Sequence, residues 1–361
     1  METGRVKKLT REKLIALHEK RTVIARADLS DCDLSGLALS YAVFEKTTLT
    51  GANLGGADLT AASFNDCDLS GANLSGAKCM WMAVRASKMT GCTLEKANLS
   101  YASLEETDAG EVNLTEADAT GLQAGSAVLK KARLVRTQFS QANLRGADLS
   151  EADLTGADFS SAYLTKAVFD GVVFSSVCFI KSDLTGVSLK GMKLDRCDLT
   201  MTDLTGSDLS GTEFIGCNLF QTGFTGAVMT GAKLGGLEAY AARFTGAVLK
   251  KADLTNAMLE SAQFTGADLT AADFSGAGMV RCMLDTAKCS AARFVGADLT
   301  YADLSHADLT GADFTNAILT RANLHRVIDA MTIWDGSNKT KAKATDPELA
   351  EAEDWQPRTN T

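Results

Sequence analysis

A five-residue period runs without interruption through most of this chain. A large apolar residue stands at nearly every fifth position from Ile24 to Leu324, which makes 61 consecutive units with no insertion or deletion. A small residue, most often alanine, precedes it by two positions, and the other positions are mostly Asp or Asn, Ser or Thr, and Gly. The central apolar position is called i below, and the small residue is then at i−2.

A period of five fits neither an α-helix nor a flat strand. Five residues turn about 500° on a helix, so the apolar residues would spiral around its surface. In a strand, an odd step sends the next apolar residue to the opposite face. Within one unit, however, i−2 and i share a strand face, and the remaining residues favour corners. The pattern therefore predicts an all-β solenoid of short sides, whose apolar residues are buried by stacking of coils.

Residue volumes support this frame. Of the fifteen phenylalanines, fourteen occupy position i, and Phe220 is the exception. Where Leu122 takes i−2, Ala124 takes i, so the two volumes exchange as close packing requires. No proline precedes Pro347, as expected where backbone N–H groups are needed between coils.

Units such as GADLT, GANLS and GADFT resemble those of the pentapeptide repeat family, whose consensus is A(D/N)LXX. The resemblance extends over residues 22–328. It implies a right-handed quadrilateral β-helix with four units in each coil, and hence about 15 coils from the 61 units.

The two ends depart from the repeat. Residues 1–21 are predicted to form an N-terminal helical cap with Thr10 as N-cap, and residues 22–328 the β-helix. Residues 329–361 are predicted to form a C-terminal cap and a flexible acidic tail, in which Thr345 is the expected N-cap of a short helix. Four apolar residues are expected to close the last coil: Val327, Ile328, Ile333 and Trp334.

Composition and motifs give no sign of catalysis, a cofactor or a metal. Eight of the nine cysteines occupy i or i−2, as small buried residues would, and no CxxC pair is present. Ser305, His306 and Asp308 are neighbours, but nothing in the repeat implies a pocket or oxyanion donors around them. We therefore expect a protein that is not an enzyme. With no apolar run near 18 residues and no secretory signal, we also expect a cytoplasmic location without membrane contact.

Outward aromatic residues gather at one corner of the expected coil. Six of the seven outward aromatics in the coil lie one or two positions after i = 39, 59, 79 and so on, every 20 residues. Aromatic and apolar residues in a row are typical of a protein-binding edge, although free drift of surface residues could also produce such a row. The predicted protein-binding edge comprises Tyr41, Trp81, Tyr101, Ile180, Met201, Phe220, Tyr240 and Tyr301.

One internal stretch, residues 107–128, breaks the volume rule. Ala109, Ala119 and Ala124 stand at i, and only the gap at Ala124 is filled by a large neighbour at i−2. Unfilled Leu-to-Ala sites cost a few kcal/mol in a packed core. This stretch is predicted to be a soft coil or a kink.

Charge and the chain ends bear on the partner. Some pentapeptide repeat proteins resemble duplex DNA and bind topoisomerases such as gyrase, which gives quinolone protection. Residues 22–325, however, carry 35 acidic and 24 basic side chains, a much weaker charge than one per about 1.7 Å in DNA. Direct nucleic-acid binding is not expected, since no basic stripe exists.

The terminal stretches LTREKLIALHEKRTVIARADLSDCDLSG and DPELAEAEDWQP are similar to pentapeptide repeat proteins associated with bacterial type VI secretion loci. That resemblance implies an accessory or adaptor role for delivered cargo. The sequence thus favours a non-enzymatic protein-binding scaffold, with a secretion component or cargo as partner and a topoisomerase as the alternative. It leaves open whether the ends dimerise.

Overall fold

Twenty residues complete one coil of the chain. The computed structural model describes residues 7–355. Parallel bridges begin at Asp28, Asp33, Ala38 and Val43, and each ends 20 residues further along. Because these starting points are five residues apart, a coil has four sides of one pentapeptide each. The predicted β-solenoid is confirmed.

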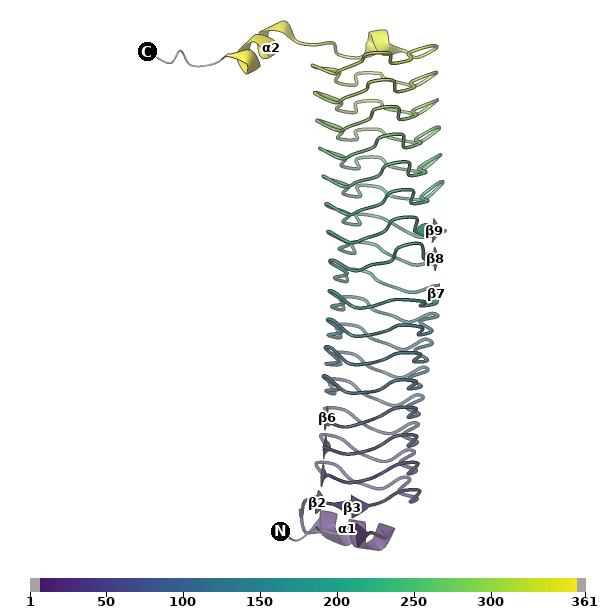
Figure 1. Ribbon diagram of the computed structural model, residues 1–361, viewed down its shortest axis with the longest axis vertical. Coiled ribbons are helices and arrows are strands. Elements are labelled where there is room, and N and C mark those ends of the chain that lie inside the picture. The colour runs from purple at the N-terminus through teal and green to yellow at the C-terminus, as the bar shows by residue number, and fades with distance from the viewer. Residues whose placement is uncertain (1–6, 356–361) are drawn as a thin grey trace, which may run out of the picture. The chain divides into compact units, whose positions relative to one another are not determined.

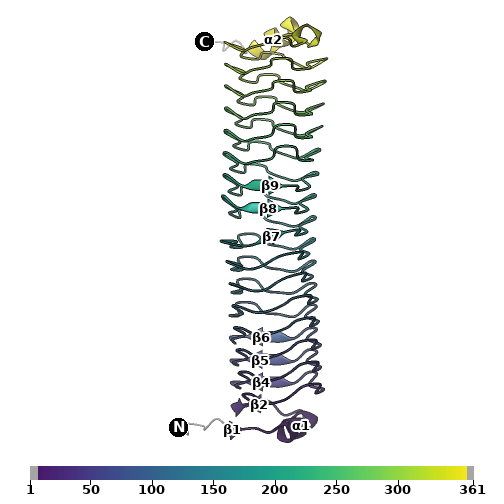
Figure 2. The same ribbon diagram turned by 90° about the vertical axis from the view of Figure 1, so that its right-hand side faces the viewer.

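The coils are grouped into two compact units. The first comprises Met1–Ser188 and Asp195–Asp198, and the second comprises Leu189–Leu194 and Leu199–Thr361. In each unit the chain winds as a stack of coils (Figures 1 and 2). The elements in chain order are β1 (Lys7–Lys8), α1 (Arg11–Glu19), β2 (Ile24–Ala25), β3 (Ala27–Asp28), β4 (Val43–Glu45), β5 (Ser63–Asn65), β6 (Ala83–Arg85), β7 (Phe174–Ser175), β8 (Lys193–Asp195), β9 (Glu213–Ile215), the 3₁₀-helix η1 (Lys339–Lys341) and α2 (Pro347–Asp354).

The core consists of the residues at i−2 and i, as the sequence predicts. Ala147 and Leu149, for example, are both fully buried. Aromatic rings at i stack on those of the next coil at the spacing of parallel strands. In the second unit, the ring of Phe244 lies 4.9 Å from that of Phe224 and 4.7 Å from that of Phe264, both nearly parallel.

The polar residues of the repeat build its corners. The backbone N–H of Ser70, at i+1, donates to Oδ1 of Asp68, at i−1, over 2.9 Å. The hydroxyl and backbone N–H of Ser70 hold the pKa of Asp68 below its ordinary value, against the opposing effect of burial. The next position, i+2, has positive φ, which is why glycine is frequent there; Gly71 has φ +68°.

The N-terminal helix caps the first coil. Thr10 is the N-cap of α1, as predicted, and its side chain accepts a hydrogen bond from the backbone N–H of Lys13. Leu14 is fully buried. The guanidinium of Arg11 donates to the backbone carbonyls of Asp33 at 2.8 Å and of Ser35 at 3.0 Å. The helix therefore satisfies carbonyls at this end of the coil series as well as covering it.

At the C-terminal end, two details of the sequence analysis are wrong. The N-cap of α2 is Asp346, whose carboxylate accepts from the backbone N–H groups of Glu348 and Leu349, and not Thr345. Ile328 and Ile333 do not close the last coil. They continue the frame at i−1, which faces outward, and both are exposed.

Trp334, at i, does close the last coil. Its ring stacks on that of Phe314 at 4.6 Å, and the ammonium of Lys339 lies 4.1 Å from the tryptophan ring. Val327 is only half-buried.

The bridges continue unbroken through the predicted soft coil, from Asp108, Asp118 and Gln123 to residues 20 positions later. The register therefore shows no kink at residues 107–128, and the softness of this coil stays a prediction. The domain boundaries predicted at residues 21 and 328 also stay predictions. None of the helices within residues 7–355 is long and apolar enough to cross a membrane.

Candidate protein-binding site

Four residues of the predicted binding edge lie in the first unit. Tyr41, Trp81 and Tyr101 occupy i+2 at the same corner of different coils, and their exposed fractions are 74%, 57% and 53%. Ile180 occupies i+1 at this corner and is half-buried. The 20-residue register of the first unit thus places the four residues on one edge of that unit.

The ring of Tyr101 lies over the following coil. A Cβ atom on Gly121 would stand 2.5 Å from Cδ1 of Tyr101, a distance that non-bonded carbon atoms do not tolerate. Only glycine at residue 121 therefore allows the tyrosine ring to lie in this position. The tyrosine ring thus packs against the backbone of the following coil, although half of the side chain faces solvent.

The other four residues of the predicted edge lie in the second unit. Met201, Phe220 and Tyr301 are exposed, and Tyr240 is half-buried. The hydroxyl of Tyr240 donates to Sδ of Met258 at 2.9 Å. The binding role of all eight residues stays a prediction.

Tyr301 stands between two arginines of the neighbouring coils. Its ring centroid lies 5.9 Å from Cζ of Arg281 and 5.6 Å from Cζ of Arg321. The guanidinium of Arg321 also donates to the tyrosine hydroxyl at 3.0 Å, and that of Arg281 lies 3.3 Å from Glu260. These contacts hold the ring in place and add charge to the edge.

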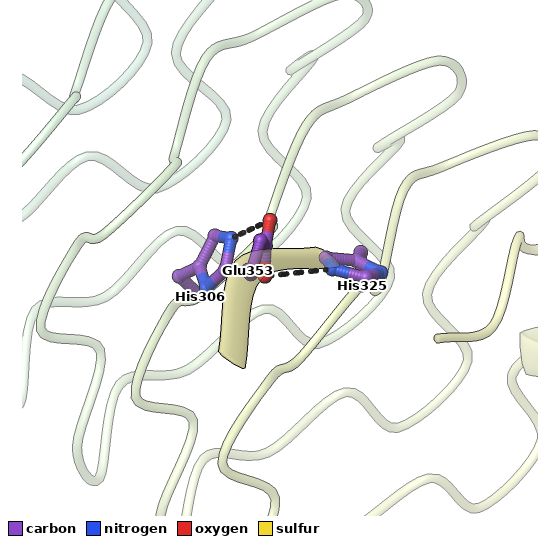
Figure 3. Close-up of side chains that lie close together, drawn as sticks. All are labelled: His306, His325 and Glu353. Atoms are coloured by element: carbon purple, nitrogen blue, oxygen red, sulfur yellow. Dashed lines mark hydrogen bonds and ion pairs between the residues drawn. The ribbon is translucent and has the colours of Figure 1, made fainter. Parts of the chain in front are cut away.

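A second group of polar residues, in the second unit, was not foreseen from the sequence. Nε2 of His306 lies 3.4 Å from Oε1 of Glu353, and Nε2 of His325 lies 3.3 Å from Oε2 of the same carboxylate (Figure 3). The side chain of His325 is almost completely buried, whereas that of His306 is partly exposed. The two histidines are 19 residues apart and lie at one corner of consecutive coils. In the sequence, this spacing alone could have indicated that they are neighbours.

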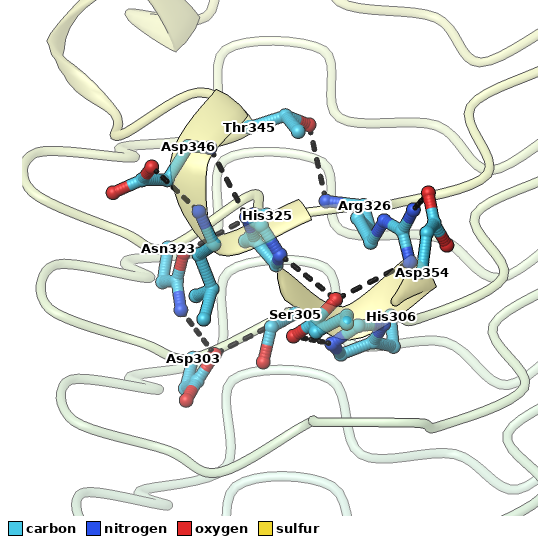
Figure 4. Close-up of polar contacts among 11 residues, drawn as sticks. Asp303, Ser305, His306, Asn323, His325, Arg326, Thr345, Asp346 and Asp354 are labelled. Carbon is cyan, nitrogen blue, oxygen red and sulfur yellow. Dashed lines mark hydrogen bonds and ion pairs between the residues drawn. The ribbon is translucent and has the colours of Figure 1, made fainter. Parts of the chain in front are cut away.

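Arg326, the N-cap residue of α2 and the last residue of that helix complete this group. We call it the C-terminal polar cluster: His306, His325, Arg326, Asp346, Glu353 and Asp354. The guanidinium of Arg326 lies 3.3 Å from Oε2 of Glu353 and pairs with Asp354 (Figure 4). The backbone N–H of Asp346 donates to Nδ1 of His325 at 3.1 Å. Helix α2 buries no side chain, so these polar contacts hold it to the coil.

The surroundings of Glu353 and Asp354 favour the ionised form of both carboxylates. Burial would raise the pKa of Glu353, but the hydrogen bond from His325 and the charges of His306, His325 and Arg326 outweigh it and lower that pKa. The hydrogen bond from Arg326 lowers the pKa of Asp354. The same pairing raises the pKa of Arg326.

Comparison with protein families decides which repeat this is. The family described as "Pentapeptide repeats (8 copies)" matches along most of the chain. The matched stretches are residues 27–66, 52–79, 87–121, 125–160, 152–191, 182–221, 197–236, 240–276 and 287–328. The chain is a pentapeptide repeat protein.

Solved structures of the same family are similar to this pentapeptide repeat protein. QnrB1, a plasmid-mediated fluoroquinolone resistance protein, is 17% identical, with 54% of this chain and 89% of QnrB1 covered and a TM-score of 0.41. HetL, from the cyanobacterium Nostoc sp. strain PCC 7120 and involved in heterocyst differentiation regulation, is 24% identical, with 82% and 90% covered and a TM-score of 0.18.

Rfr23, from the cyanobacterium Cyanothece 51142, is 32% identical, with 26% of this chain and 64% of Rfr23 covered and a TM-score of 0.25. Because these TM-scores are below 0.5, the structures do not inform the function. No curated protein sequence matches the chain.

Seven of the nine cysteines of this pentapeptide repeat protein are buried in its coils. Burial raises the pKa of Cys79 and of Cys92 to about 12, so neither thiol is a thiolate at neutral pH. The backbone N–H of Ser305 donates to Asp303, and Nε2 of His306 faces Glu353. Pentapeptide repeat proteins are generally non-enzymatic structural or binding proteins.

His306, His325 and Glu353 are residue types that bind metals, and their ligand atoms lie within 4.8 Å of one another. The hydrogen bond from Asp346 to Nδ1 of His325, however, places the proton of the neutral ring on Nε2, the atom that faces Glu353. A histidine ligand needs the opposite arrangement, with a free lone pair toward the metal. The neighbouring guanidinium of Arg326 also disfavours a cation. The cluster is thus suited to hold a carboxylate.

Acidification is expected to release α2. The lowered pKa values of Glu353 and Asp354 mean that docking is favoured by these groups above the ordinary carboxyl pKa of about 4 and that this contribution is lost as the pH falls through the lowered values. An undocked eight-residue helix is not stable in water, so hydrogen exchange of residues 348–354, corrected for its intrinsic pH dependence, should rise below about pH 4.

The matched control for this pH series is E353Q/D354N, which removes both titrating carboxylates and keeps their shape. Its α2 should exchange rapidly at neutral pH and show no acid step. Unchanged protection of residues 348–354 in the wild type down to pH 3 would show that the ion pairs do not hold the helix.

Proposed function

We propose that this pentapeptide repeat protein is a non-enzymatic scaffold or adaptor that binds another protein along its aromatic edges. The observation that carries the proposal is the exposure of Tyr41, Trp81 and Tyr101 on one edge of the first unit and of Phe220 and Tyr301 on one edge of the second. Tyrosine and tryptophan are enriched among the residues that dominate protein–protein binding energy.

Order in the edge side chains supports this proposal. Fixing a mobile side chain on binding costs about 0.5–1.5 kcal/mol. The ring of Tyr101 is held over Gly121, and that of Tyr301 between two arginines, before any partner arrives. Binding at these positions therefore loses less entropy than binding through free surface aromatics.

The finer role that we propose is that of an accessory protein of a bacterial type VI secretion system, with a secretion component or cargo as partner. It rests on the similarity of the two terminal stretches described above. A rigid coil with a contact edge suits an adaptor, because it can present several side chains at fixed spacing.

Binding to a topoisomerase by DNA mimicry is the second candidate, and the surface charges favour it less. Many aspartates at i−1 bond to the N–H group two residues later in their own corner. Others are paired with basic residues of the neighbouring coil, such as Asp268 with Lys250 at 3.1 Å and Asp273 with Arg293 at 3.1 Å. The anionic groups thus alternate with cations, unlike a phosphate backbone.

The test is capture of a partner by tagged protein from native cell extract. The edge variant carries Trp81→Ser, Tyr101→Ser, Phe220→Ser and Tyr240→Ser. The matched control carries four serines at exposed apolar residues away from these edges: Val128, Tyr163, Val228 and Met283. Circular dichroism checks that both variants fold.

We expect the edge variant to capture at least about tenfold less partner than the wild type, since residues of this kind contribute about 2 kcal/mol each to binding. The control should capture as much partner as the wild type. Identification of the partner, followed by a DNA supercoiling assay with purified gyrase, separates the secretion role from the topoisomerase role. Equal capture by both variants would rule out the aromatic edges as the binding site.

A further inference from the structure

The C-terminal polar cluster lies at a corner that is otherwise uncharged over several coils of the second unit. The two residues after i at this corner are Thr-Gly in four consecutive coils, at residues 205–206, 225–226, 245–246 and 265–266. In the next coil they are Asp285-Thr286, and in the last coils they become Ser305-His306 and His325-Arg326. Three basic side chains therefore lie close together at this corner. The fold does not require them, because other coils carry Thr-Gly at the same positions.

The basic side chains of this corner surround a carboxylate in the structure. Glu353 presents Oε1 to His306 and Oε2 to both His325 and Arg326, while Asp354 pairs with Arg326 (Figures 3 and 4). His325 is fixed by burial and by the N–H of Asp346. The corner is therefore a preformed carboxylate-binding site, as its occupation by the Glu353 carboxylate shows.

The segment that occupies this corner is only lightly attached. No residue of α2 is buried, and the apolar residues Leu349, in the helix, and Trp355, directly after it, have exposed fractions of 49% and 72%. Exposed ion pairs of this kind contribute little individually. Tethering compensates, since a short linker gives a local concentration in the millimolar range. A competing ligand therefore has to overcome only that local concentration, because α2 buries no apolar surface that would also have to be displaced.

We propose that the corner formed by His306, His325 and Arg326 is a recognition site for an acidic segment of a partner protein, and that α2 occupies it in cis until such a segment displaces it. The partner segment carries two adjacent carboxylates, as Glu353 and Asp354 do. Release of α2 at the same time frees Leu349 and Trp355 from their fixed position beside the coil. The site is independent of the aromatic edges.

The experiment uses the full chain and a defined probe. The probe is a fluorescein-labelled peptide with the sequence of residues 345–355, TDPELAEAEDW, and the control peptide carries glutamine and asparagine in place of its last Glu-Asp pair. The receptors are the wild type and the E353Q/D354N variant, in which the corner is vacated. Fluorescence anisotropy measures binding at low salt and at about 0.5 M NaCl, where surface charges are screened.

We expect E353Q/D354N to bind the acidic peptide at least about tenfold more tightly than the wild type, because the cis segment no longer competes. The control peptide should not bind, and high salt should weaken binding of the acidic peptide. Adding Arg326→Gln to E353Q/D354N should abolish binding. If that variant folds poorly, His306→Ala, at a partly exposed residue, should weaken binding instead.

Two results would overturn the proposal. One is equal binding of the acidic and control peptides, or no binding of either to E353Q/D354N. The other is a wild-type dimer in light scattering that E353Q/D354N converts to a monomer, which would assign the contact to exchange of α2 between two copies of the chain.

Discussion

Replacing Phe244 with alanine is expected to lower the free energy of unfolding by about 3–5 kcal/mol. The side chain is fully buried at position i, and its ring stacks on those of Phe224 and Phe264 at 4.9 Å and 4.7 Å. Alanine would leave a cavity between two rings that are held by their own coils and cannot move together. Both the lost transfer free energy and the lost ring contacts contribute.

The matched control is Phe220→Ala, the same substitution at the one phenylalanine outside position i. Phe220 lies at a corner and is 38% exposed, so its removal should cost less than about 1 kcal/mol. Urea denaturation of both variants, followed by circular dichroism, measures the difference. Similar losses for the two variants would mean that the five-residue frame does not decide which side chains form the core.

The repeat made the fold predictable because a single rule governs hundreds of residues. Every buried position of a coil is named by the frame, so Leu149 and Phe244 could be assigned to the core from their numbers alone. The frame also explains the two errors at Ile328 and Ile333. These residues were assigned by their apolar character, but they stand at i−1, and the frame sends that position outward.

The candidate sites were predictable only where they follow the period. The corner that carries Tyr41, Trp81 and Tyr101 follows from the 20-residue coil, whereas the contacts that order Tyr101 and Tyr301 depend on neighbours in the next coil. The C-terminal polar cluster could not be predicted, because the path of residues 335–346 brings α2 to its place and no repeat governs that path. The choice of Asp346 over Thr345 as N-cap has the same origin: the hydroxyl of Thr345 accepts from the backbone N–H of Arg326 instead.

Proline substitutions should change the free energy of unfolding very differently at a side of the coil and at a corner. At Val248→Pro we expect a loss of about 3 kcal/mol or more in the free energy of unfolding. The backbone N–H of Val248, at i−1, donates to the carbonyl of Ala227 in the preceding coil at 2.9 Å. Proline removes this donor and leaves the buried side of the ladder with an unpaired carbonyl.

Thr245→Pro, three residues earlier, is the matched control. Among the described residues, no hydrogen bond is donated by the N–H of Thr245. Thr245 is followed by Gly246 at φ +63°, and the N–H of Ala247 donates to the carbonyl of Phe244 at 3.0 Å. This is the arrangement of a type II turn, which favours proline at its second residue.

In thermal and urea denaturation, the free energy of unfolding of Thr245→Pro should therefore lie within about 0.5 kcal/mol of that of the wild type. It should be slightly higher if the restriction of the unfolded chain by proline dominates. Position i+1 of such a unit accepts proline because its N–H is free, whereas the positive φ at i+2 and the backbone hydrogen bonds of the other positions exclude it. Equal destabilisation by the two prolines would contradict this distinction between the hydrogen-bonded N–H of Val248 and the free N–H of Thr245.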